Sequence, residues 1–408
     1  MTLARLLGPH AGAVLRPPFL PYWLGQSVSA LGDRMTAVAL PAVVLSLGGG
    51  ASDLARLAAW STGAQLALLL IGGVLVDRLP RRAVLLAMDG LRAVLLGVTA
   101  WFLAQGQVSI TALVALSAAL GACSALFYPA TASILPELVD DAQLVPANAL
   151  RNLSNQLSGV IGPALGGMLV ALGGASFALG MDALSFVVGA LGLYLMRPRP
   201  RRLQEVAAQP LWREALEGFR IILASTWLWL TIGLFALVNI FFGGLNVVVL
   251  PLYAREVLGG APDLGWLYTA QALGAVVAAL VLGRLGSVRR RGIVAYTAVV
   301  GQGSAVALLA LAGSLLPAML ALFVSGACVT LFSVLWEATL QERVPNEALG
   351  RVASVDMLGS IALLPLGFVV LGQAVEVLGV TGSALACGSI ITLLALLGLS
   401  TRAVRGLE

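Results

Sequence analysis

The sequence contains no lysine, one histidine (His10) and three cysteines, and charged residues make up 11% of its 408 positions. A soluble domain carries about 25% charged residues, so this composition excludes an ordinary soluble protein. The cysteines lie in apolar runs without metal-ligand spacing, and no Ser/Lys, Cys/His or clustered acidic motif is present. Because a GxxxxGK[ST] phosphate loop is also missing, neither enzyme chemistry nor ATP-driven work is expected.

Hydrophobic residues dominate instead, at 59% of the chain with a mean hydropathy of +0.98. A helix needs about 20 apolar residues to cross a bilayer. Runs of that length predict twelve spans, at residues 20–46, 54–76, 83–104, 108–133, 148–172, 175–196, 226–252, 263–284, 292–313, 317–340, 354–376 and 380–400.

The arginines indicate the orientation of these spans. Twenty of the 24 fall on the side that holds both termini, whereas the opposite loops hold Arg56 and Arg255. Cytoplasmic loops keep positive charge, so both termini are predicted to be cytoplasmic, and the basic pI does not indicate nucleic-acid binding. The amino-terminal residues have no cleavable signal pattern. A polar linker, 197–225, with an amphipathic helix from Leu211 to Phe219, separates two six-helix halves, 1–196 and 226–408.

The two halves are related in sequence. Residues 121–127 read GACSALF and residues 326–332 read GACVTLF, 205 positions later. The same offset relates Glu137 to Glu342 and Gly162 to Gly367. Parallel repeats of six spans are an architecture of secondary transporters, in which the substrate path lies between the repeats.

The loop between spans two and three reads GVLVDRLPRRAVL from Gly73. It resembles the signature loop of the major facilitator superfamily, Gly-x-Leu-x-Asp-Arg-x-Gly-Arg-Arg, with Pro80 in place of the usual glycine. The resemblance implies a gating motif made of Gly73, Asp77, Arg78, Arg81 and Arg82, in which Asp77 latches the cytoplasmic side. The alternative is an anchor that sets topology without switching.

Span five carries SGVIGPALGG, which resembles the motif of exporters in this superfamily through Gly162, Pro163, Gly166 and Gly167. Ordinary small-residue helix packing would explain the same glycines. The stretches after Phe127 and Leu340, and span one, resemble the exporter branch that includes macrolide-efflux pumps and the enterobactin exporter. Thr131 stands where those relatives often have arginine.

Ionisable residues inside the spans are candidates for ion coupling, since burying a charge in a membrane costs roughly 2.5 to 3.5 kcal/mol. Asp33 is the first proton-coupling candidate and Asp182 the second, while Asp89 and Arg92, three residues apart, are expected to form a membrane ion pair. A permanent pair with Arg34 or with a cation of another span is the alternative for Asp33. Candidates for the substrate cavity are Gln26, Ser29, Tyr128, Asn239, Asn246, Tyr268, Gln271 and Trp336.

The sequence therefore predicts an all-α membrane protein with twelve helices in two six-helix repeats, the major facilitator fold, working by alternating access in a bacterial inner membrane. The expected function is proton-coupled export of a lipophilic drug-like compound or a siderophore. Its partners would be that small molecule, protons and lipid, with no cofactor, metal or nucleic acid, and the protein is expected to be a monomer. The alternatives are a metabolite importer or facilitator, a lipid translocase, and a non-transporting membrane sensor.

Overall fold

A computed structural model of the chain describes residues 18–196, 198, 211–285 and 288–407, and for residues 70–78, 211–216 and 346–347 it describes the backbone alone. The described residues contain helices and no strands. Their contacts divide the chain into two compact units, residues 1–49 with 60–203 and residues 50–59 with 204–408. His10 lies outside the described residues.

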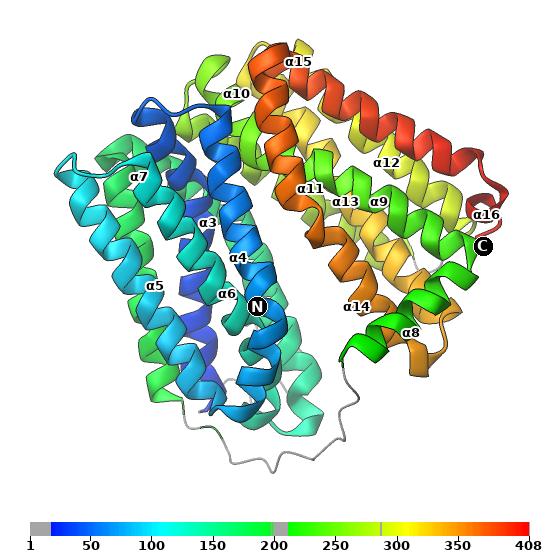
Figure 1. Cartoon of the computed structure of the whole chain (residues 1–408), viewed down its shortest axis with the longest axis horizontal. Helices are drawn as coiled ribbons and strands as arrows, with labels where there is room; N and C mark the ends of the chain where they lie inside the picture. The colour runs from blue at the N-terminus through cyan, green and yellow to red at the C-terminus, as the bar shows by residue number, and fades with distance from the viewer. Residues whose placement is uncertain (1–17, 197, 199–210, 286–287, 408) are drawn as a thin grey trace. The chain divides into compact units, whose positions relative to one another are not determined.

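The helices of the first half coincide with the predicted apolar runs (Figure 1). They are α3 (Phe19–Ser46), α4 (Ala51–Arg78), α5 (Arg81–Ala104), α6 (Ile110–Leu138), the short η1 (Asp141–Gln143) and α7 (Leu144–Leu195). Helix α7 contains two helices in sequence, because Gly174 (φ 76°, ψ 173°) breaks it where spans five and six were predicted to meet. A positive φ of this kind is accessible chiefly to glycine.

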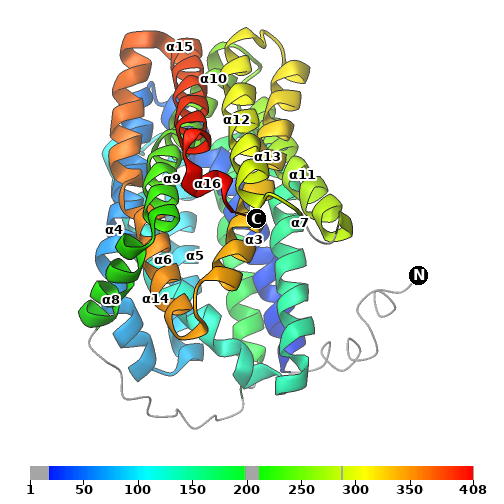
Figure 2. The ribbon, with the colours of Figure 1, turned by 90° about the vertical axis from the view of Figure 1, so that its right-hand side faces the viewer.

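The second half repeats this pattern after the linker helix, and Figure 2 shows its helices from the side. Its elements are α8 (Leu211–Ala224), α9 (Thr226–Gly244), the π-helical η2 (Leu245–Val249), α10 (Leu250–Glu256), α11 (Ala261–Leu285), α12 (Arg291–Leu308), η3 (Leu309–Leu311), α13 (Leu315–Arg343), α14 (Asn346–Ala362), α15 (Leu364–Ser400) and α16 (Arg402–Arg405). Gly379 (φ 71°, ψ 175°) breaks α15 as Gly174 breaks α7.

Nine segments in the described part of the chain are long and apolar enough to cross a membrane. Two of them exceed 50 residues and hold the breaks at Gly174 and Gly379. The positions of the predicted spans are thus confirmed as helices, while the count of twelve crossings and the side of the termini stay predictions.

The repeated heptapeptide has a packing role. A Cβ on Gly121 would lie 2.0 Å from the carbonyl oxygen of Ser61, and a Cβ on Gly326 would lie 1.9 Å from that of Gln271. Both glycines therefore let α6 and α13 touch the backbone of α4 and α11 respectively, which only a residue without a side chain permits. The sequence repeat preserves one helix crossing in both halves.

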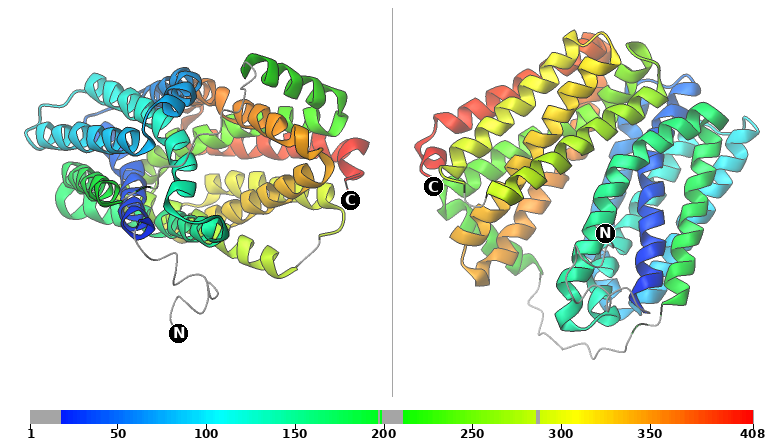
Figure 3. Two further views of the ribbon diagram at one scale, coloured as in Figure 1. Left: turned by 90° about the horizontal axis from the view of Figure 1, so that it is seen from below. Right: turned by 180° about the vertical axis from the view of Figure 1, so that it is seen from behind.

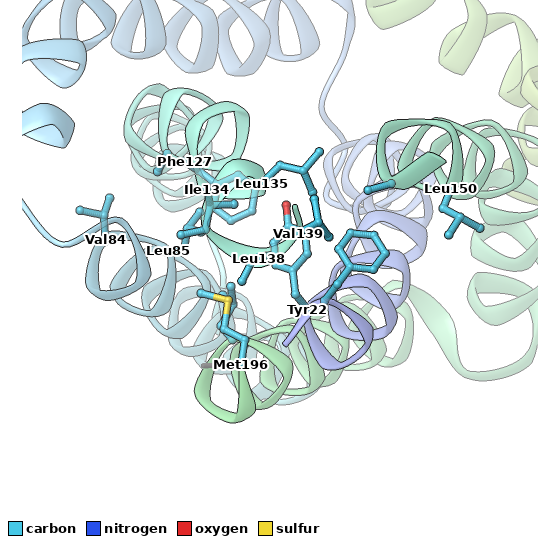
Figure 4. Close-up of a cluster of buried hydrophobic side chains, with 14 residues drawn as sticks. Tyr22, Val84, Leu85, Phe127, Ile134, Leu135, Leu138, Val139, Leu150 and Met196 are labelled. Atoms are coloured by element: carbon cyan, nitrogen blue, oxygen red, sulfur yellow. The ribbon is translucent and has the colours of Figure 1, made fainter. Parts of the chain in front are cut away.

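The first unit has a hydrophobic core at the end of its bundle where α3 begins (Figure 4). The rings of Phe19 and Tyr22, the side chains of Leu85 and Leu138, and Met196 after α7 are each at most 2% exposed. This cluster joins α3, α5, α6 and both ends of α7, which fixes the helices that carry the polar residues described below.

The linker helix α8 packs on α14, and both views of Figure 3 show the two helices adjacent. A Cβ on Gly218 would lie 2.8 Å from the carbonyl oxygen of Arg351, and Glu217 pairs with Arg351 at 3.0 Å. The predicted amphipathic helix thus extends to Ala224 and uses its small residue to contact a helix of the second unit.

Candidate functional site

Helices α3 and α7 cross closely because the glycines of the span-five motif are buried between them. A Cβ on Gly162 would lie 2.4 Å from Cβ of Arg34, and one on Gly166 would lie 2.8 Å from Cα of Met35. Pro163 and Gly167 are also buried. The motif therefore holds α7 against the turn of α3 that carries Asp33.

Asp182 of α7 lies inside this crossing with its side chain fully hydrogen-bonded. Thr36 donates to its Oδ2 at 2.5 Å and Ser185 donates to its Oδ1 at 2.9 Å. A Cβ on Gly32 would come within 2.2 Å of Oδ1, and Asp182 is 1% exposed. The carboxyl is thus enclosed by two hydroxyl donors and a glycine on the neighbouring helix.

Asp89 of α5 is equally buried, at 0% exposure, and accepts a hydrogen bond from Nε2 of Gln26 at 2.9 Å. Its Oδ1 has no hydrogen-bond partner among the described residues. Gly189 of α7 gives it room, since a Cβ there would lie 2.9 Å from Oδ2 and 3.2 Å from Cβ of Ser29. Ser29, predicted as a cavity residue, is buried in this packing.

Arg92 supplies the buried positive charge. It is 4% exposed, donates to Oγ of Ser124 at 2.9 Å, and places its guanidinium 4.6 Å from the ring centroid of Phe127 and 5.4 Å from that of Phe186. Arg92 acts electrostatically on Asp89, but each side chain makes its hydrogen bond to a different helix, and the membrane ion pair stays a prediction. Aromatic faces and one hydroxyl compensate the desolvation of the guanidinium.

Asp33 differs from the other two acids because it is exposed. Arg92 and Arg34 act on it electrostatically, and Asp33 in turn acts on Tyr128, which is 57% exposed. Asp33 also lies within electrostatic range of Asp89 and Asp182. We call Asp33, Asp89, Asp182 and Arg92 the acidic cluster: three carboxyls, one of them accessible, surround a buried cation.

The buried acids of the acidic cluster are surrounded by neutral hydrogen-bond donors. Within the described residues, no group of three or more His, Cys, Asp or Glu side chains is arranged to hold a metal ion. Asp89 and Asp182 take their hydrogen bonds from neutral donors, Gln26, Thr36 and Ser185. A carboxyl in such surroundings changes its charge by gaining or losing a proton.

The arginines of the predicted gating motif connect helix ends within the first unit. Arg81, at the start of α5, pairs with Glu137 at the end of α6. Arg82 donates to the carbonyl oxygens of Leu193, at 3.0 Å, and Tyr194, where α7 ends. Cations at helix carboxyl ends are stabilised by the helix dipole. For Gly73, Asp77 and Arg78 the structure describes the backbone alone.

The second unit repeats this connection, because Arg291 at the start of α12 pairs with Glu342 at the end of α13 at 2.5 Å. Glu342 is the repeat partner of Glu137. The matching stretch of the second half, GRLGSVRRR from Gly283, has no acid equivalent to Asp77. It nevertheless keeps the same ion pair between helix ends.

A pocket of about 160 Å³ lies in the second unit, and we call it the aromatic pocket. Two predicted cavity residues, Asn239 and Trp336, line it. Its other lining residues are Thr231, Ile232, Phe235, Val238, Phe242, Gln302, Val329, Phe332, Ser333, Asp356 and Ser360. The pocket therefore combines four aromatic side chains with one carboxylate.

The remaining cavity candidates of the second half lie elsewhere. Asn246 donates to the carbonyl oxygen of Phe242 at 2.8 Å, and Tyr268 donates to that of Asn246 at 2.5 Å. Gln271 lies against Gly326, with its buried Nε2 unpaired among the described residues. These three residues are placed at helix contacts, whereas Tyr128 and Gln26 belong to the surroundings of the acidic cluster.

Comparison with known proteins supports the expected family. The family model described as Major Facilitator Superfamily matches residues 22–355. The chain belongs to the major facilitator superfamily. It is 29% identical over 345 residues to the enterobactin exporter EntS of Shigella boydii serotype 18, covering 82% of this chain and 80% of that protein. The EntS of Salmonella typhi is also 29% identical, over 348 residues.

Solved structures show the same fold. The nucleoside transporter NupG superposes with a TM-score of 0.75 at 13% identity, over 93% of this chain and 98% of that chain. A bacterial homologue of the iron transporter ferroportin in an inward-facing state gives a TM-score of 0.71 at 16% identity, over 98% and 100%. This chain is accordingly an all-helical, multi-pass membrane transporter.

In this major facilitator protein the two halves place different chemistry at equivalent positions. The ion pairs, glycine contacts and helix breaks above relate the halves by 205 to 210 positions. With the offsets of 210 and 205 positions, Asp89, Arg92 and Asp182 correspond to Val299, Gln302 and Cys387. The first half thus carries ionisable groups at positions where the second half carries uncharged ones.

Asp356 is the functional candidate that sequence reasoning missed. It lies in α14, accepts from Nε1 of Trp336 at 3.0 Å and lines the aromatic pocket. The signal was available, since Asp356 is a carboxylate near the start of the predicted span 354–376. What the sequence lacked was a sign that Trp336 of α13 lies beside it.

Proposed function

We propose that this transporter is a proton-coupled exporter of lipophilic compounds in the bacterial inner membrane, working by alternating access. The observation that carries the proposal is the acidic cluster, in which one carboxyl, Asp33, is exposed while Asp89 and Asp182 are buried beside it. A proton-coupling group has to exchange protons with water. Because a charge in the membrane is costly, ionisable residues at this depth mark candidate functional sites.

In this mechanism Asp33 either carries a proton or interacts with the substrate, and the two states exclude one another. Substrate entering from the cytoplasm displaces the proton, and reprotonation from the outside releases the substrate. Because each occupant weakens the binding of the other, proton entry drives substrate exit. Arg92 interacts with all three carboxyls, and a change of charge at Asp33 alters the electrostatic potential at Asp182. We therefore assign Asp182 as the second coupling residue.

The direction of transport is supported by two findings. The relatives at 28 to 29% identity are named enterobactin exporters, and the span-five glycines that resemble an exporter motif lie in the α3–α7 crossing. The aromatic pocket supports a lipophilic substrate, because stacked rings favour aromatic ligands. The gating role of Asp77 belongs to the same proposal.

The test is substrate-dependent proton movement in proteoliposomes of known orientation, with a panel of dyes, macrolides and siderophores. Wild-type protein is expected to couple outward substrate flux to inward proton flux. Asp33→Asn is expected to abolish the proton flux. Asp53→Asn is the matched control, because Asp53 pairs with the exposed Arg56 at the start of α4 and is no part of the acidic cluster, and it should behave as wild type.

Unchanged proton flux in Asp33→Asn would move the coupling to Asp182, which Asp182→Asn would then test. Substrate flux that needs no proton gradient would indicate a facilitator. Substrate binding without any flux would indicate a sensor, and both results contradict the proposal.

A further inference from the structure

The aromatic pocket contains a stack of three nearly parallel rings. Phe235 and Phe332 lie 3.6 Å apart between ring centroids with an interplanar angle of 9°, and Trp336 lies 6.3 Å from Phe332 at 12°. The rings come from α9 and α13, and Tyr296 of α12 packs edge-on against Phe235 and Phe332. Parallel ring faces in a lining attract aromatic groups and organic cations.

Among the described residues, no cation lines the pocket beside its single carboxylate. Trp336 donates to Oδ2 of Asp356 at 3.0 Å, and no other described hydrogen bond uses this side chain. The lining contains no arginine, and the chain has no lysine. The free oxygen of Asp356 therefore offers a negative charge and an acceptor to whatever occupies the pocket.

A second polar group is also available. Gln302 of α12 lines the pocket and is 3% exposed, and its side-chain amide takes part in no hydrogen bond described for this structure. Because Gln302 lines the pocket, its amide can donate or accept a hydrogen bond with a ligand there.

The size of the pocket limits the ligand. An apolar cavity of about 150 Å³ binds benzene, so a pocket of about 160 Å³ holds one aromatic ring with a short substituent. A larger substrate would insert only one of its rings.

We infer that the aromatic pocket is a subsite for a protonated aryl-alkyl amine, either free or as one part of a larger substrate. The aromatic ring packs against the outside of the stack formed by Phe235, Phe332 and Trp336. The ammonium donates to Asp356, and Gln302 accepts a further hydrogen bond through its carbonyl oxygen. An anionic aromatic group is rejected, because it would place like charge against Asp356. The inference deepens the proposed function and rests on it for the role of the subsite in transport.

The test is direct binding to the purified full-length protein by isothermal titration calorimetry, with three ligands of one shape. They are phenethylamine, which is cationic at neutral pH, 2-phenylethanol, which is neutral, and 3-phenylpropionate, which is anionic. Wild-type protein is expected to bind phenethylamine at least about tenfold more tightly than 2-phenylethanol, since a charge-assisted hydrogen bond is worth that factor or more. 3-Phenylpropionate is expected to bind weakest.

Asp356→Asn keeps an acceptor for Trp336 and is expected to remove the preference for the amine while 2-phenylethanol still binds. Glu376→Gln is the matched control, because Glu376 is an exposed carboxylate of the same unit outside the pocket lining. Gln302→Leu should weaken phenethylamine binding by a smaller factor. Thermal unfolding of each variant verifies that it is folded.

Equal binding of the three ligands to wild-type protein, or an amine preference that survives in Asp356→Asn, would overturn the inference. Neither result depends on transport, so the two proposals fail separately. Amine binding without any flux of protons or substrate would support the subsite and contradict the exporter. Proton-coupled flux of other compounds without amine binding would support the exporter and contradict the subsite.

Discussion

Replacing Gly326 with alanine is expected to break the helix crossing that the repeated heptapeptide maintains. The added Cβ would lie 1.9 Å from the carbonyl oxygen of Gln271 and 2.8 Å from its carbonyl carbon. Ordinary contact between these atoms needs at least about 3.2 Å, so α13 and α11 must separate by more than 1 Å. The obstacle is backbone, which cannot rotate away as a flexible side chain can.

Overpacking of this kind costs about 1–3 kcal/mol in well-packed cores, and the lost contacts along the crossing add to it. A cost of 1 kcal/mol lowers Tm by about 2–4 °C in a domain of 150–250 residues, so Gly326→Ala should lower the Tm of the second unit by about 2–12 °C. Gly121→Ala should do the same in the first unit, where the Cβ would meet Ser61 at 2.0 Å.

The assay is thermal unfolding of the purified protein in detergent, followed by tryptophan fluorescence. Gly233→Ala is the control, because a Cβ at this helical glycine of α9 meets no atom within 4 Å. It should leave Tm unchanged or raise it, since alanine favours helix over glycine. A Gly326→Ala protein as stable as the Gly233→Ala protein would refute the packing role of the repeat.

Three further outcomes are expected. Gly379→Ala should destabilise the protein by about 1–3 kcal/mol in thermal unfolding, because φ 71° with ψ 175° is strained for alanine. The cause would be the backbone alone, since no atom lies within 4 Å of the new Cβ, and wild-type stability would contradict this. Arg291→Glu should lower Tm and the added Glu342→Arg should restore part of the loss, whereas additive losses would show that the ion pair contributes nothing. Thr36→Val removes the 2.5 Å donor to Asp182 and should slow coupled proton flux in proteoliposomes without unfolding the protein, while an unchanged rate would remove Asp182 from the coupling path.

Much of the fold followed from the sequence because a bilayer imposes a simple rule on it. Every apolar run long enough to cross the hydrocarbon became a helix, since unpaired backbone groups cannot be left in lipid. The repeat was equally readable, and the glycines that it conserves proved to be contact points and helix breaks. The boundary between spans five and six was predicted at the position where Gly174 has a positive φ.

The partners of the polar residues could not be predicted from the sequence. The spacing of Asp89 and Arg92 indicated a local pair, yet Gln26 of α3 and Ser124 of α6 take their hydrogen bonds. In the same way, Trp336 of α13 donates a hydrogen bond to Asp356 of α14. Helix periodicity determines which face a residue occupies on its own helix, but the neighbour it meets depends on how separate helices cross.

The sequence by itself therefore determined that this is a helical membrane transporter with two related halves, because hydrophobic length and repeat are properties of one chain segment at a time. Only the tertiary structure decided which side chains meet, such as Thr36 with Asp182 and Trp336 with Asp356. Such contacts join residues on different helices, up to 146 positions apart here, which no local pattern records.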